Sequence, residues 1–236
     1  MLICDRFVFI HMHKTAGTWL NEILKASAPT DWNLYEVDGG EPDSHQAYES
    51  IPESHRHLPR LALVRNPYDW YVSMYSMWRN RYLTGVTGGS EEVRTPFGHP
   101  ESEWDVGERA WGPLLVGAPG GPAGFQGAIQ RGAFFPPNLA AAPFTDVLAE
   151  LTGDEPTYYG YFESLVPDLC EFFDAIGVEL PIEIVSAFST RAPVNVSRRP
   201  RDWRPFYDDT TRGLVEHYDR KTLDVFDYTF EGLRHA

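Results

Sequence analysis

The sequence predicts an α/β protein with a central, mostly parallel sheet flanked by helices. Short apolar runs of strand length occur at residues 7–11, 61–64 and 157–162. Each run is followed by a segment in which apolar residues recur at helical spacing. Strands that alternate with helices pair in parallel, because a parallel connection needs a crossover segment. The 236 residues are expected to form a single domain, 1–236, with a sizeable core.

The first elements follow directly from this alternation. Residues 7–11 form a buried strand, and a helix runs from Thr15 to about Ser27, where Pro29 ends it. The further elements predicted in this half are strands at 31–37 and 61–64 and a helix at 68–81.

The stretch from Gly85 to Pro143 is dense in glycine and proline and has weak periodicity. Long segments of this kind in a compact domain usually have a function, so we predict an acceptor-binding insertion at about 85–143. A disordered insertion is the alternative. After it, the pattern predicts helices at 144–151, 167–176, 181–187 and 208–226, a strand at 157–162 and a basic loop at 194–204.

The composition limits the partners that the protein can have. Its net charge of −14 repels nucleic acid and anionic membranes at long range, so an anionic ligand has to be held by local basic groups.

The two cysteines, Cys4 and Cys170, are too few for a disulfide framework, and no metal-ligand spacing occurs, so no metal site is expected. Without a signal-peptide or membrane-spanning pattern, the protein is expected in the cytoplasm. The oligomeric state is open.

Two segments combine a strand end with groups that hold anions. In the first, the loop Lys14-Thr-Ala-Gly-Thr18 follows the strand at 7–11 and precedes a helix. Backbone N–H groups at a helix N-terminus bind phosphate or sulfate. In the second, the strand at 61–64 ends at Arg65, again before a helix. Together they predict a ligand with two separated anionic groups.

The paired segments resemble the sulfotransferases that use 3′-phosphoadenosine 5′-phosphosulfate (PAPS), and most of all the carbohydrate-type branch. That branch typically has a His-x-x-Lys-Thr-Ala/Gly-Gly-Thr loop and an Arg-Asn-Pro-Tyr-Asp segment, which match residues 11–18 and 65–69. Residues 161–163 and the C-terminal run also fit, whereas the middle of the chain is unmatched. The resemblance implies a P-loop-like sulfotransferase fold. It also implies transfer of a sulfuryl group to a hydroxyl of a small-molecule or sugar acceptor, with 3′-phosphoadenosine 5′-phosphate (PAP) as product and no metal.

By this resemblance, the first loop holds the nucleotide at its 5′ end. The residues implied there are His13, Lys14, Thr15, Ala16, Gly17 and Thr18. His13 stands where the family usually has proline, which puts a histidine near the reactive sulfur. Lys14 would stabilise the charge that develops on the leaving phosphate oxygen. Trp19 matches a tryptophan that packs on the adenine in cytosolic sulfotransferases, and a core tryptophan is the alternative.

The resemblance also assigns the 3′-phosphate and the base. Arg65 and Ser73 would bind the 3′-phosphate, since Ser73 lies eight residues on, about two helical turns away. Arg198 and Arg199 would add a contact to that phosphate, or form a solvated charge pair. His45, in Ser44-His-Gln-Ala-Tyr48, would accept the proton of the acceptor hydroxyl. His13 and Glu36 are the alternative bases.

Two other functions stay open. A P-loop nucleotide-dependent kinase or phosphotransferase needs a glycine upstream of its lysine, whereas here Lys14 precedes Gly17. A catalytically inactive nucleotide-binding module would not require Lys14, Thr18, Arg65 and Ser73 together. The acidic, aromatic segment at 101–111 suits a neutral or cationic acceptor.

Overall fold

The computed structural model describes residues 1–37, 47–84, 121–132, 143–153, 155–194, 196 and 199–233. They group into two compact units. The first combines residues 1–65 with 148–196, and the second combines 66–147 with 197–236. The expectation of a single domain over 1–236 stays a prediction. In the described part of the chain, no helix has both the length and the apolar character that crossing a membrane requires.

The first unit contains a mixed five-stranded sheet with the order β3-β1-β2-β4-β5. Its strands are β3 (Tyr35–Glu36), β1 (Leu2–Ile3), β2 (Val8–Ile10), β4 (Arg60–Val64) and β5 (Tyr158–Tyr161). The pairs β2–β4 and β4–β5 are parallel, with Phe9 opposite Leu61 and Ala62 opposite Tyr159. The predicted α/β class is therefore confirmed.

The sheet is mixed because the chain turns back on itself before β2. A tight turn in which the Cys4 amide donates to the Phe7 carbonyl oxygen (3.1 Å) sets β1 antiparallel to β2. On its other side, β1 pairs antiparallel with β3. The sequence analysis missed β1, because two residues are too few to show periodicity. The parallel part is thus confined to β2, β4 and β5, and these strands carry the candidate site.

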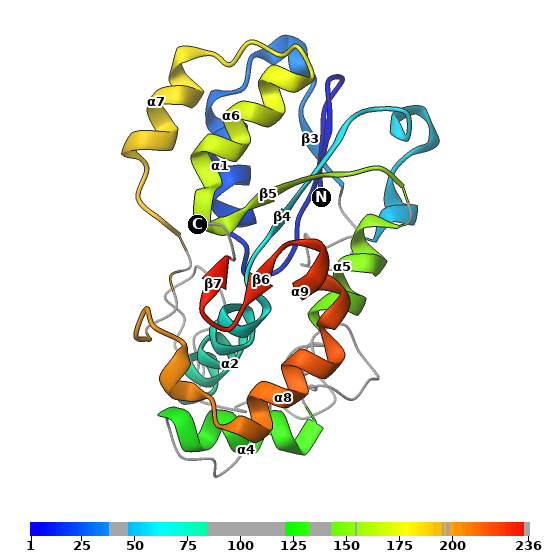
Figure 1. Cartoon of the computed structure of the whole chain (residues 1–236). Helices are drawn as coiled ribbons and strands as arrows, with labels where there is room; N and C mark the ends of the chain where they lie inside the picture. Colours follow the sequence, from blue (N-terminus) through cyan, green and yellow to red (C-terminus); the bar gives the residue numbers. More distant parts are fainter. Residues whose placement is uncertain are drawn as a thin grey trace, which may run out of the picture. The chain divides into compact units, whose positions relative to one another are not determined.

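The helices of the first unit are α1 (Gly17–Ser27), α6 (Leu165–Ala175), α7 (Ile182–Thr190) and part of α5 (Phe144–Thr152). α1 and α6 share a core with the sheet strands, and α7 lies beside α1 (Figure 1). α6 packs against β5, and α7 packs against α1. In the core, the Phe7 ring, just before β2, meets the rings of Trp32 and of Phe172 and Phe173 on α6 edge-on. Gly177, one residue beyond the C-cap Ile176 of α6, has φ +68°, the left-handed conformation that commonly ends a helix.

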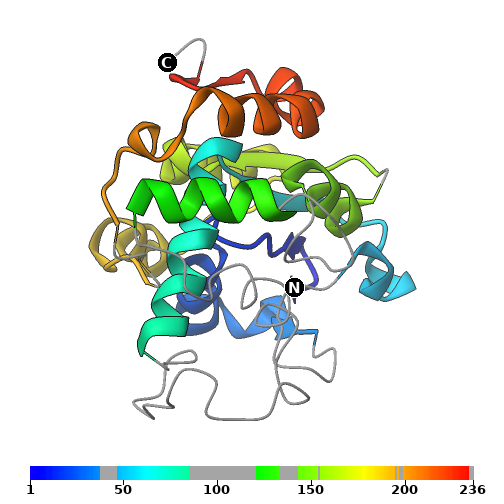
Figure 2. The same ribbon diagram turned by 90° about the horizontal axis from the view of Figure 1, so that it is seen from below.

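The second unit is built mainly of helices. These are α2 (Pro67–Thr84), α4 (Gly121–Gly132), α8 (Asp209–Tyr218), α9 (Arg220–Val225) and the first turn of α5, with a hairpin of β6 (Tyr228–Thr229) and β7 (Gly232–Leu233). α2, α4 and α8 pack on one another, and Figure 2 shows them from a second direction. Their core is a cluster of aromatic rings: Tyr68, Tyr75, Phe125, Phe206, Tyr207 and Phe230.

Short 3₁₀ turns join these elements. They lie at Thr30–Trp32, Tyr48–Ser50, Glu53–His55, Phe162–Ser164 and Arg204–Phe206.

α4 lies within the predicted insertion at 85–143 and was not predicted. Its glycines hide the helical spacing of Phe125, Ala128 and Ile129, all of which are buried. Residues 85–120 and 133–142 lie outside the described residues. The acceptor-binding role of this insertion therefore stays a prediction.

The predicted helix at 208–226 is divided into α8 and α9 at Asp219. The Asp219 side chain is buried, and its carboxylate accepts hydrogen bonds from the Thr145 amide (2.7 Å) and the Tyr71 hydroxyl (2.8 Å). Burial raises the pKa of Asp219 to about 6. This carboxylate links the junction of α8 and α9 to α2 and to the first turn of α5, which explains why one amphipathic segment becomes two helices.

Candidate anion-binding site

The turn between β2 and α1 has the backbone geometry of an anion site. Lys14 (φ 58°) and Ala16 (φ 75°) are left-handed, and Thr15 between them is not. Alternation of this kind turns successive N–H groups toward one point and makes an anion-binding concavity. The Thr15 hydroxyl donates to the Met12 carbonyl oxygen at 2.9 Å, which closes the turn from inside. The first turn of α1 holds no acidic residue, so the positive end of the helix dipole faces an anion unopposed.

Gly17, the first residue of α1, is required by its neighbour His11. A Cβ atom at position 17 would lie 1.9 Å from His11 Cδ2 and 2.3 Å from its Nε2. His11 is 4% exposed, and its ring stacks on Phe9 in β2. The ring is therefore held in place and cannot simply swing away. This contact explains why the loop has glycine at the start of the helix.

Replacing Gly17 by alanine should accordingly disrupt the turn. We expect a loss of about 1–3 kcal/mol in the free energy of unfolding, because the added methyl group overpacks a buried contact. Denaturant unfolding measures this loss. Gly177→Ala is not a suitable control because its backbone is left-handed, so Gly213→Ala on α8, where a Cβ meets nothing within 4 Å, is used instead. An unfolding free energy for Gly17→Ala equal to that of Gly213→Ala would contradict the packing argument.

Arg65 lies next to this turn within the same unit. It follows β4, is 7% exposed, and donates a hydrogen bond of 2.8 Å from Nη1 to the carbonyl oxygen of Lys14. Its guanidinium lies over the ring of Phe162, with Cζ 4.0 Å from the ring centroid. The two anion-holding groups predicted from the sequence are thus in contact. They meet because parallel β2, β4 and β5 all end at the same edge of the sheet.

Two further predicted residues belong to the second unit. Ser73 lies on α2 and is 2% exposed. Arg199 forms an ion pair with Asp69 in the first turn of α2, and both side chains are 8% exposed. The sequence analysis offered a solvated charge pair as the alternative for Arg199. That part is wrong, because the guanidinium is buried against a carboxylate. A role of Ser73 or Arg199 at the 3′-phosphate stays a prediction.

Trp19 is placed in the core of the first unit. It is 7% exposed, its indole Nε1 donates to the Arg191 carbonyl oxygen at 3.2 Å, and its ring stacks on Phe188 of α7. The structure thus favours the core alternative over the adenine contact.

The remaining candidates, His45 and Arg198, lie outside the described residues, so their predicted roles stay predictions.

Glu36, an alternative base, points to the wrong end of α1. Its carboxylate pairs with Lys25, which lies in the last turn of that helix. Lys25 is eight residues after Gly17, a rise of about 12 Å along the helix axis. The Glu36 side chain is therefore directed away from the turn, and the structure does not support it as a base.

Sequence reasoning missed two partner residues, Phe162 and Asp69. Phe162 follows β5 as Arg65 follows β4, and this shared position in a parallel sheet was the available signal. Asp69 stands in the motif segment at 65–69, but nothing local to it indicates a partner in the loop at 194–204.

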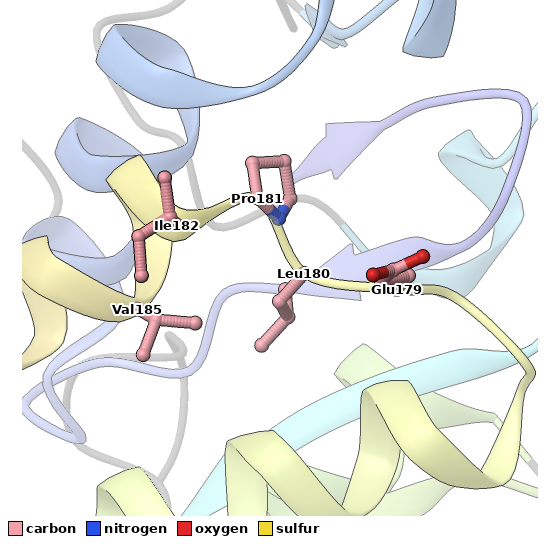
Figure 3. Close-up of a pocket in the computed structure, with 5 residues that line it drawn as sticks. All are labelled: Glu179, Leu180, Pro181, Ile182 and Val185. Atoms are coloured by element: carbon pink, nitrogen blue, oxygen red, sulfur yellow. The ribbon is translucent and has the colours of Figure 1, made fainter.

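Other features of the described residues do not suit an anion. Within the described ranges, no group of three or more histidine, cysteine, aspartate or glutamate side chains could hold a metal ion. A shallow pocket at the start of α7 is lined by Glu179, Leu180, Pro181, Ile182 and Val185 (Figure 3). Four of its five lining side chains are apolar and the fifth, Glu179, is acidic, so its side chains offer no group that would hold an anion.

No known family model matches the chain, and no curated protein matches it. Among solved structures, the chain is similar to mouse sulfotransferase SULT7A1, whose crystal structure is complexed with PAP. The similarity covers 94% of this chain and 85% of that chain, at 16% sequence identity and a TM-score of 0.49. A likeness at this level identifies no functional residue, so support for a function comes from the chain's own side chains.

Proposed function

We propose that the protein is a sulfotransferase that transfers a sulfuryl group from PAPS to a hydroxyl of a small-molecule or saccharide acceptor. The observation that carries this proposal is the left-handed turn at Lys14 and Ala16, which presents backbone N–H groups and a lysine at the start of α1. Such a turn suits a tetrahedral anion. Arg65, in contact with the same turn, suits a second anionic group. A nucleotide with phosphate at both its 3′ and 5′ positions fits this pair.

In the proposed reaction, the acceptor oxygen attacks sulfur while the bond between sulfur and the 5′-phosphate oxygen breaks. The acceptor proton passes to a base, a role that we assign to His45, with His13 as the alternative. Negative charge develops on the departing phosphate oxygen, and PAP leaves. Lys14 would stabilise that charge, with Thr18 and the amides of the turn holding the phosphate.

The charge of the protein supports the proposed acceptor class. With a net charge of −14, the protein opposes the approach of a polyanionic chain. A neutral or cationic small molecule or sugar meets no such barrier. The acceptor would bind in the insertion at about 85–143, and membership of the carbohydrate-type branch is part of the same proposal.

Calorimetric titration with PAP tests the nucleotide class, with ATP and Mg²⁺ as the comparison. We expect micromolar or tighter binding of PAP and at least about tenfold weaker binding of ATP, because a bidentate arginine contact to the 3′-phosphate is lost. Preference for ATP would overturn the proposal in favour of a phosphotransferase. Binding of neither nucleotide would instead favour an inactive module.

A further inference from the structure

Arg65 contacts the backbone of the anion-binding turn in addition to its proposed role at the 3′-phosphate. Its hydrogen bond ends on the carbonyl oxygen of Lys14, 51 residues earlier in the chain. Lys14 has φ 58°, a conformation that residues with side chains rarely adopt. Such a backbone persists only where the surrounding contacts hold it. The buried Arg65 guanidinium supplies one of these contacts.

The ring of Phe162 fixes the plane of that guanidinium. The 4.0 Å between Arg65 Cζ and the ring centroid lies well within the range of cation–π stacking. Phenylalanine offers no hydrogen-bonding group, so its influence on Arg65 is through this ring face. A flat guanidinium held on one face keeps its N–H groups in a fixed direction.

Phe162 is itself held by the start of α6. The amide of Tyr161 and the hydroxyl of Ser164 both donate to the same carboxylate oxygen of Asp168, at 2.6 and 3.0 Å. These two bonds bracket Phe162 and close the connection between β5 and α6. These hydrogen bonds therefore hold the backbone of Phe162 in place. A side chain that positions another side chain, as Phe162 would position Arg65, needs such a fixed backbone.

We infer that Phe162 is a positioning residue of the nucleotide site, which acts through Arg65 on the conformation of the Lys14 turn. The contacts run from the Phe162 ring to the Arg65 guanidinium and on to the Lys14 carbonyl oxygen. The inference rests on the proposed function, and it adds that the two anion-holding groups are mechanically coupled. Loss of the ring face should then loosen the 5′ group as well as the 3′ group.

Hydrogen exchange of the ligand-free protein tests the mechanical part without any nucleotide. In Phe162→Leu, which keeps an apolar side chain but removes the ring, we expect the amides of residues 14–20 to exchange about fivefold faster. Phe162→Tyr keeps the ring face and should exchange like the wild type. Arg65→Lys, which keeps the charge but loses the planar fork, should behave like Phe162→Leu. The α6 peptide, 165–175, should be unchanged in each folded variant.

Titration with PAP and with adenosine 5′-phosphate, which lacks the 3′-phosphate, tests the functional part. We expect Phe162→Leu to weaken adenosine 5′-phosphate about fivefold, and PAP by at least that factor because PAP contacts both groups. Unchanged exchange at residues 14–20 in both Phe162→Leu and Arg65→Lys would overturn the inference. Weakening of PAP alone would also overturn it, because Arg65 would then serve only the 3′-phosphate. If the wild type binds neither nucleotide, the proposed function fails and the exchange result alone decides the inference.

Discussion

Lys14→Ala is expected to lower the rate of sulfuryl transfer by about 10²–10³-fold, because a preorganised charge at the leaving oxygen is lost. Binding of PAP should weaken much less, since the amides of the turn and Arg65 remain. Turnover is measured as PAP released from PAPS with an acceptor identified from a panel of hydroxyl compounds. An equal loss in PAP affinity and in turnover would instead mean that Lys14 acts only in binding.

The chain offers matched controls for this experiment. Lys25→Ala removes a lysine from the last turn of α1, the helix that follows the Lys14 turn. The exposed ion pair of Lys25 with Glu36 contributes little to stability, so turnover of this variant should equal that of the wild type. Lys14→Gly separates the amine from the backbone, because glycine adopts the left-handed conformation of position 14 without strain. Turnover should fall as far in Lys14→Gly as in Lys14→Ala. Wild-type turnover in either variant would remove Lys14 from the mechanism.

The elements that carry the site were predictable because they are short, apolar and bounded by local signals. The strand at 7–11 and the helix to Ser27 correspond to β2 and α1, and the strand at 61–64 corresponds to β4. Local sequence also indicated an anion-binding turn, through the lysine and glycine between strand and helix. The left-handed backbone at Lys14 and Ala16 could not be predicted, since neither residue favours it.

Contacts between distant segments were the part that sequence could not provide. The support of Arg65 by Phe162 depends on β4 pairing with β5, across an interval of almost one hundred residues that includes the insertion at 85–143. The ion pair of Asp69 with Arg199 joins residues 130 positions apart. Which side chains meet over such intervals depends on how the whole chain folds, so a local sequence pattern does not predict these contacts. The core position of Trp19 against Phe188 has the same origin.

The buried ion pair between Asp69 and Arg199 should be the most costly of these contacts to break. Both side chains are 8% exposed, and the other terminal nitrogen of Arg199 donates to the carbonyl oxygens of Pro200 and Arg201. Asp69→Ala leaves this guanidinium buried without its carboxylate, a change that typically costs about 3–5 kcal/mol in the free energy of unfolding. Denaturant unfolding followed by tryptophan fluorescence measures that loss.

The matched control is Asp202→Ala, because Asp202 pairs with Arg204 at the exposed surface. We expect it to cost no more than about 1 kcal/mol, since solvent screens exposed pairs. Arg199→Met combined with Asp69→Leu removes both charges from the buried position, and it should recover much of the stability lost in Asp69→Ala because no uncompensated charge remains. A double variant as unstable as Asp69→Ala would show that volume, and not charge, dominates at this position. If Asp69→Ala lowers the free energy of unfolding no more than Asp202→Ala does, water reaches the ion pair of Asp69 and Arg199, and Arg199 is available to bind a phosphate.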